Sequence, residues 1–215
     1  MDATDLLDGL LAKGANDTRF FGVVIGIVTN NQDPERMHRV KLRFPWLSGE
    51  DESDWARVAS PMAGKGRGLY LLPEVDDEVL VAFEHGDVDY PFVIGTLWNG
   101  SDAPPANNGD GRNNHRALFS RSGHVLRMDD SSGQERIEII DKSGDNRIVI
   151  DTSARKIRIE AQGDIEISSA TGKVKIDAVG IELNSKTDVK VQAQTTIDID
   201  ANAQASIQAA LVKIN

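Results

Sequence analysis

The 215-residue chain contains no cysteine, so neither disulfide bonds nor cysteine-held zinc can stabilise it. It also lacks any run approaching the roughly 20 apolar residues that a membrane-spanning helix needs. The opening residues, MDATDLLDGLLAKGAN, are acidic at their start and have no long apolar core of the kind found in signal peptides. We therefore expect a protein that is made in the cytoplasm without a signal peptide.

Positive charge is scarce as well. The chain has 24 Lys and Arg against 34 Asp and Glu, a net charge of −10. Because nucleic-acid binding needs clustered Lys and Arg, we expect no nucleic-acid partner. Residues 45–102 hold 12 acidic and 3 basic residues, whereas residues 155–215 hold 8 of each. The excess negative charge therefore belongs to a middle domain, and the C-terminal part is balanced.

Aromatic residues and prolines are missing from the last part of the chain. All 11 aromatic residues lie at or before Phe119, and all 7 prolines lie at or before Pro105. This change of character divides the chain. We expect a short N-terminal helix or arm over residues 1–19, a β domain over 20–99, a linker over 100–118 and a repetitive shaft over 119–215.

Residues 20–99 contain short apolar runs separated by turn-forming residues. Val40, Leu42 and Phe44 alternate with basic residues, which predicts a strand with one buried face. The segment EVLVAFEHGDVDYPFVIGTLWN predicts a hairpin around Gly86. About five strands in roughly 80 residues indicate a compact OB-type barrel. The glycine-rich AGKGRG lacks the spacing of a phosphate-binding loop and predicts a structural turn instead.

Pairs of apolar residues two positions apart recur through the C-terminal part, with a mean spacing of about eight residues. Each pair predicts one short strand whose two aliphatic side chains point inward while charged residues point out. The side chains that we expect in the core of such a shaft are Ile148, Ile150, Ile157, Ile159, Ile165, Ile167, Val174, Ile176, Ile181, Leu183, Val189, Val191, Ile197, Ile199 and Ile207.

One such strand is not stable on its own. Two buried aliphatic side chains contribute roughly 3–5 kcal/mol, which is less than the cost of ordering eight residues at about 1.5 kcal/mol each. The repeat must therefore stack, either as one chain coiling with three strands per turn or as three chains wound around one axis. The exclusively aliphatic interior and the LVKIN end, which has no polar cap, favour three chains.

The ordered motifs WARV, AGKG, LPEVDDEVLV and GDVDYP, followed by HRALFSRSGHVLRMDDSSGQERIEI, resemble VgrG and gpV-like baseplate spikes of contractile injection systems, the phage baseplate assembly protein V family. The resemblance covers roughly residues 20–215. It implies an all-β protein in which an OB-fold barrel precedes an intertwined trimeric β-helix. It further implies a homotrimeric needle that connects a hub protein and inner tube to a tip protein and punctures the target cell envelope mechanically.

Three departures from the family pattern narrow this expectation. Only about 20 residues precede the OB region, which indicates the short, gpV-like form with a separate hub protein. The linker has no room for an inserted muramidase. The last histidine is His124, so the His-x-His iron site of some spike tips is absent. The resemblance instead implies a PAAR-type tip protein on a platform formed by Leu211, Val212, Lys213, Ile214 and Asn215.

No catalytic residue, metal site or cofactor is expected. The acidic clusters at residues 74–78 and 129–130 are typical of solvated turns rather than of the opposed carboxylates of a glycosidase. Two other functions stay open. One is a monomeric single-chain β-helix acting on polysaccharide, and the other is an OB module that binds oligosaccharide or single strands. The negative charge of the OB region disfavours the second.

Overall fold

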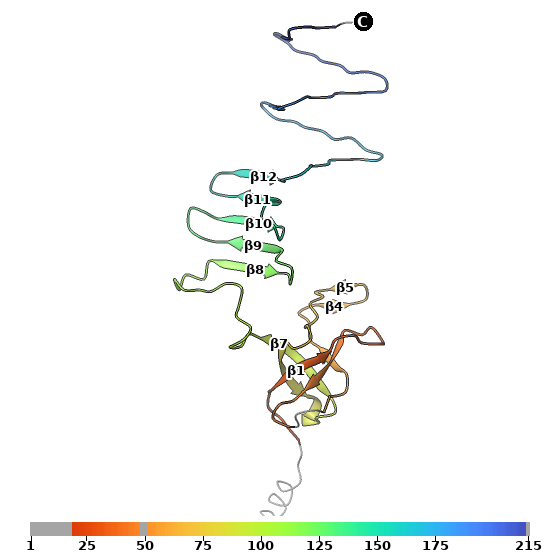
Figure 1. Ribbon diagram of the computed structural model, residues 1–215, viewed down its shortest axis with the longest axis vertical. Coiled ribbons are helices and arrows are strands. Elements are labelled where there is room, and N and C mark those ends of the chain that lie inside the picture. Colours follow the sequence, from red (N-terminus) through yellow and green to blue (C-terminus); the bar gives the residue numbers. More distant parts are fainter. Residues whose placement is uncertain (1–18, 48–50, 214–215) are drawn as a thin grey trace, which may run out of the picture. The chain divides into compact units, whose positions relative to one another are not determined.

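The computed structural model describes residues 19–47 and 51–213 and divides the chain into two units, Met1–Glu160 and Ala161–Asn215 (Figure 1). The helix expected at the N-terminus falls on residues 1–18, outside the described residues. No helix within the described ranges has both the length and the apolar character to span a membrane.

The first unit begins with a closed barrel of five strands in the order β1-β2-β3-β7-β6. Strands β3 and β7 pair in parallel, and every other neighbouring pair is antiparallel. This arrangement confirms the predicted OB-fold barrel. The strands are β1 (Val24–Asn30), β2 (Arg39–Arg43), β3 (Ala56–Val58), β6 (Glu78–Phe83) and β7 (Pro91–Leu97).

The barrel core comes from alternating residues of these strands. Val40 and Leu42 are fully buried and Phe44 is nearly so, as their alternation predicted. They pack with valines of the other strands in one cluster. A side chain on Gly26 would approach Val81 and Phe44 to within 3.2 and 3.3 Å, so a glycine at this position lets the Phe44 ring reach the core.

Two short elements complete the barrel. The 3₁₀ helix η1 (Glu84–Gly86) joins β6 to β7 and confirms the hairpin predicted around Gly86. The AGKGRG segment forms a small hairpin of β4 (Ala63–Gly64) and β5 (Arg67–Gly68), which agrees with the predicted structural turn.

After the barrel, a five-stranded antiparallel sheet follows in simple chain order. Tight turns connect its strands. Its strands are β8 (His115–Phe119), β9 (Val125–Asp129), β10 (Arg136–Ile140), β11 (Arg147–Asp151) and β12 (Lys156–Glu160). This part of the repeat therefore pairs within one chain.

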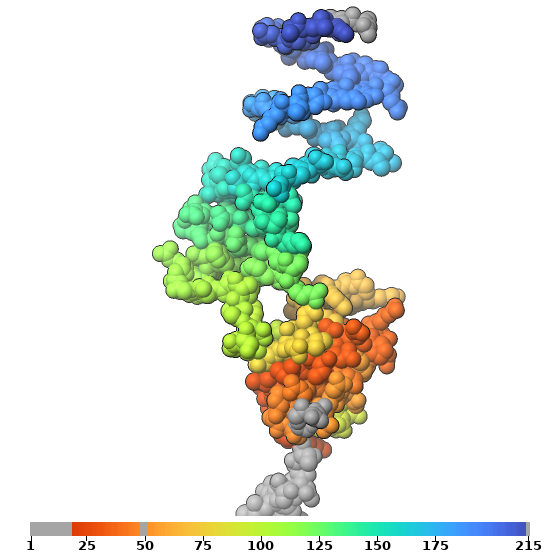
Figure 2. All heavy atoms as spheres, in the orientation of Figure 1, coloured from red at the N-terminus to blue at the C-terminus, as the bar shows by residue number. Residues whose placement is uncertain are grey.

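The second unit differs in kind. From residue 161 to residue 213 no strand is assigned and every residue is exposed. In Figure 1 this segment, coloured cyan to blue, runs as an open zigzag, and in Figure 2 it is a single extended strip of atoms. Its successive passes do not pair with each other, so a single copy of this unit has no core of its own.

Candidate functional site

The sheet β8–β12 has two faces of opposite character. Cross-strand pairing places Ile137 opposite Ile150 and Ile139 opposite Ile148, and β12 continues the same rows. Nine large apolar side chains share this face, which we call the apolar face, and they are between 41% and 67% exposed. They are Leu118, Leu126, Met128, Ile137, Ile139, Ile148, Ile150, Ile157 and Ile159.

The opposite face carries paired charges, and we call it the charged face. Arg127 donates a hydrogen bond from Nε to Oε2 of Glu138 over 2.8 Å. Arg136 lies 3.2 Å from the carboxylate of Asp129. Glu138 and Asp129 are only 7% and 5% exposed, and Val149 beside them is fully buried. Each buried carboxylate on this face therefore has a cationic partner, as burial of a charge requires.

The neighbours of Asp129 stabilise the ionised form of its carboxyl group. Hydrogen bonds from Ser131 are the main reason that the pKa of the Asp129 carboxyl lies below its usual value, and the nearby His115 and Arg136 lower it further. Asp129 therefore stays ionised in a nearly buried position.

The usual burial pattern is thus reversed in this sheet. The charged face satisfies its own groups, whereas nine large apolar side chains on the apolar face remain open to solvent. Exposed apolar patches of this extent mark surfaces that bind another protein. The chemistry of the apolar face suits contact with another aliphatic surface.

The predicted shaft-core residues fall in two places. Ile148, Ile150, Ile157 and Ile159 lie on the apolar face, where each is at least 41% exposed. The other eleven belong to the second unit, and each of them is at least 50% exposed. One pattern of open aliphatic side chains therefore runs through both units.

The predicted tip platform lies at the end of the second unit. Leu211 is 70% exposed and Val212 is 47% exposed. Lys213 is also exposed. Ile214 and Asn215 lie outside the described residues.

The acidic clusters take positions in turns and strands. The amide of Glu74 donates to Asp77 Oδ2 over 2.8 Å, and the amide of Asp89 donates to Asp87 Oδ1. Within the described ranges, His, Asp and Glu residues form no group of three or more that could hold a metal ion.

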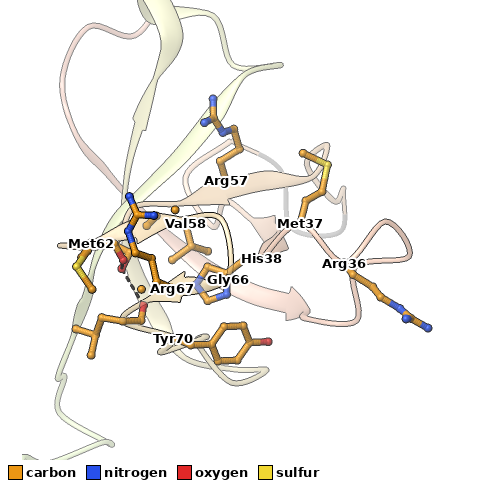
Figure 3. Close-up of a pocket in the computed structure, with 14 residues that line it drawn as sticks. Arg36, Met37, His38, Arg57, Val58, Met62, Gly66, Arg67 and Tyr70 are labelled. Carbon is orange, nitrogen blue, oxygen red and sulfur yellow. Dashed lines mark hydrogen bonds between the residues drawn. The ribbon is translucent and has the colours of Figure 1, made fainter.

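Two features escaped the sequence reasoning. The first is the burial of the charged face: the alternation predicted outward charged residues, but not that Glu138 and Asp129 would be nearly buried in ion pairs. The second is a hollow of about 610 Å³ beside the β4–β5 hairpin, to which Arg36, Arg57 and Arg67 contribute (Figure 3). These three arginines are far apart in sequence, so only folding reveals that they share one surface.

Residues 24–98 match the family model described as the type VI secretion system/phage-baseplate injector OB domain. The barrel therefore defines an OB domain of contractile injection machinery. Among curated proteins, VgrG4b of Pseudomonas aeruginosa, a type VI secretion system spike protein, is 37% identical over 134 residues, which are 55% of this chain and 16% of the relative. Over about half of its length the chain is similar to VgrG spike proteins, in agreement with the resemblance of its motifs to VgrG and gpV-like baseplate spikes.

Two further spike proteins show the same extent of similarity. VgrG1a of Pseudomonas aeruginosa is 31% identical over 145 residues, covering 61% of this chain and 22% of the relative. VgrG3 of Vibrio cholerae is 29% identical over 145 residues, covering 65% of this chain and 13% of the relative. The chain thus spans about a fifth or less of the length of these relatives.

Proposed function

We propose that three copies of this chain wind their C-terminal segments around one axis to form the central spike of a contractile injection baseplate. The observation that carries the proposal is the exposure of the eleven predicted shaft-core residues of the second unit, whose described residues form no β-ladder within their own chain. Neighbouring copies would supply both the missing strand partners and the missing apolar cover.

The energetics support association. A single pass of about eight residues cannot offset its ordering cost by burying two aliphatic side chains, as estimated above. Three chains sharing one axis bury every pair from three sides and pair the strand edges between copies. The absence of aromatic residues after Phe119 suits a slender axis, which has room for Ile and Val but not for Phe or Trp.

The function would be mechanical and would need no catalytic step. Contraction of a sheath drives the inner tube forward, and a rigid shaft concentrates that force on a narrow apex at the target cell envelope. In this scheme the protein assembles into the baseplate and is delivered to the target envelope.

Two partners complete the proposed spike. A hub protein and the inner tube would meet the end that carries the OB domains. A PAAR-type tip protein would bind the platform at residues 211–215. Exposed Leu211 and Val212 support the second contact, because three copies of them would otherwise present apolar surface to water.

Light-scattering mass after gel filtration tests the proposal. The trimer predicts about 70 kDa, three times the chain mass of 23.4 kDa. A mass of 23.4 kDa would contradict the trimer. A monomer that also releases reducing ends from an envelope polysaccharide would support the alternative, a single-chain β-helix acting on glycan.

A further inference from the structure

The hollow beside the β4–β5 hairpin concentrates positive charge in an acidic domain. Residues 45–102 contain only 3 basic residues, and they are Arg57, Lys65 and Arg67. Arg57 and Arg67 line the hollow, and Lys65 lies between two of its lining residues. Arg36 from the loop before β2 adds a further cation, and none of the described carboxylates contributes to the lining.

The arginines of the hollow are not neutralised by their own chain. Within residues 19–47 and 51–213, no ion pair involves Arg36, Arg57 or Arg67. Nδ1 of His38, which also lines the hollow, is buried without a hydrogen-bond partner among the described residues. The His38 ring packs against Tyr70 with 4.6 Å between ring centroids, so this atom is enclosed by its own chain and the cations are the groups open to a partner.

The walls of the hollow are apolar and firmly built. Met62 and Tyr70 are 54% and 74% exposed. The hydroxyl of Ser60 donates to the carbonyls of Met62 and Leu69, which fastens the base of the hairpin. Figure 3 shows Arg57 and Arg67 extending in the same direction, with Tyr70 at the other side of the hairpin. The Arg57 guanidinium lies 5.4 Å from the centroid of the Phe92 ring. The surface thus combines fixed apolar contacts with cations that form no ion pair among the described residues.

An acidic turn of the same barrel has the complementary chemistry. Residues 74–78 carry four carboxylates and no basic residue, and Val75 among them is 46% exposed. Glu74 pairs with Arg121 of its own chain over 3.1 Å, so the proposed contact depends on the other three carboxylates. Backbone hydrogen bonds between Val28 and residues 76 and 77 hold this turn on β1. The turn is absent from the lining of its own chain's hollow.

We infer that the hollow of one copy receives the acidic turn 74–78 of the next copy, a contact that rests on the proposed trimer. Val75 enters between Met62 and Tyr70 while the carboxylates meet Arg57 and Arg67. Since the two surfaces differ, the contact is head to tail, and such contacts close into a ring when the rotation between copies is that of the three-fold axis. Three of them join the barrels around the axis independently of the shaft.

Crosslinking tests this contact in the full chain, because the chain has no cysteine of its own. A Met62→Cys/Val75→Cys variant treated with a short bis-maleimide should give covalent dimers and trimers on a denaturing gel. The control is Met62→Cys/Glu84→Cys, which uses an exposed acidic position on η1 and should stay monomeric on the gel.

The outcomes separate this contact from the trimer itself. A light-scattering mass near 23.4 kDa for the untreated protein means that the proposed function has failed. A native trimer that yields only monomer bands overturns the inference alone. Equal crosslinking through Glu84 also overturns it, because the acidic turn would then have no special role.

Reversing the charges on the two sides of the proposed contact tests it independently. Arg67→Glu in the crosslinking variant should slow the formation of covalent trimer by roughly tenfold, because like charges then face each other. Adding Asp76→Arg should restore most of the rate. A loss that Asp76→Arg leaves unrepaired would show that Arg67 acts on its own hairpin, and the inference would be wrong.

Discussion

In the barrel, Val40 and Leu42 have no exposed surface, whereas Ile167 and Ile199 in the second unit are 75% and 78% exposed. Both regions are built from short strand-like segments with alternating apolar residues. The barrel closes on itself, so five segments cover one another's apolar faces. The second unit has no such closure. The same local pattern therefore specifies a self-sufficient core in one region and a surface for association in the other.

The turns explain where the chain changes from strands that pair with one another to segments that do not. Three turns of the sheet β8–β12 contain Ser-Gly, and the glycines Gly123, Gly133 and Gly144 all adopt positive φ. This conformation lets the chain reverse tightly and pair with itself. After residue 160 the described glycines have no positive φ. Without tight reversals, successive passes of one chain stay apart, and in the proposed trimer other copies fill the gaps.

The largest expected effect comes from a charge placed in the proposed axis of the shaft. Ile167→Asp would bury three carboxylates without partners, a change that costs several kcal/mol per trimer. We expect the trimer to be lost, leaving a 23.4 kDa species by light scattering while the barrel stays folded by circular dichroism. The matched control is Glu166→Lys, which changes charge at the neighbouring outward position and should remain trimeric. A soluble trimer of Ile167→Asp would contradict the shaft.

A second experiment lowers the stability of the barrel and leaves the proposed shaft unchanged. Leu42→Ala removes a fully buried side chain from the core and should lower the free energy of unfolding of this domain by about 2–5 kcal/mol. Calorimetry should show a lower barrel transition, and light scattering should still give the trimer. Ile25→Ala, at a position that is 45% exposed, is the control with a much smaller effect. Loss of the trimer with Leu42→Ala would mean that the two regions are not independent.

Sequence reasoning succeeded where local pattern decides the structure. Alternation at Val40, Leu42 and Phe44 was enough to predict a barrel strand, and the motifs were enough to predict the family. It did not separate the sheet β8–β12 from the second unit, because the aliphatic pairs are alike in both. The difference lies in the Ser-Gly turns, which occur between the strands of the sheet. Nor could sequence reasoning find the hollow, since Arg36, Arg57 and Arg67 come from three separate segments and line it together only after folding.

The proposed tip platform offers a test with a smaller effect. Leu211→Asp would place three charges on a surface that is proposed to contact a PAAR-type tip protein. Its affinity for that protein, measured by calorimetric titration, should fall by about tenfold or more, equivalent to at least 1.4 kcal/mol. The trimer mass should not change. A comparable loss with Lys186→Glu, far from the end in sequence, would point to general damage to the shaft rather than to a platform.

The smallest expected effect concerns a turn that lets the sheet pair with itself. Hydrogen bonds from Ser143 and Asn146, in that order, are the main reason that the pKa of Asp141 is lowered to about 2. A carboxyl whose pKa is depressed on folding stabilises the folded state above its unfolded pKa of about 3.9, and this contribution is lost as the pH falls toward 2. Asp141→Ala should therefore lower the unfolding temperature of the sheet at pH 7, and the difference from the native chain should shrink between pH 4 and pH 2. Asp145→Ala, which removes a carboxylate from the same exposed turn, is the matched control. A constant difference across that range would mean that Asp141 acts through its shape rather than through its charge.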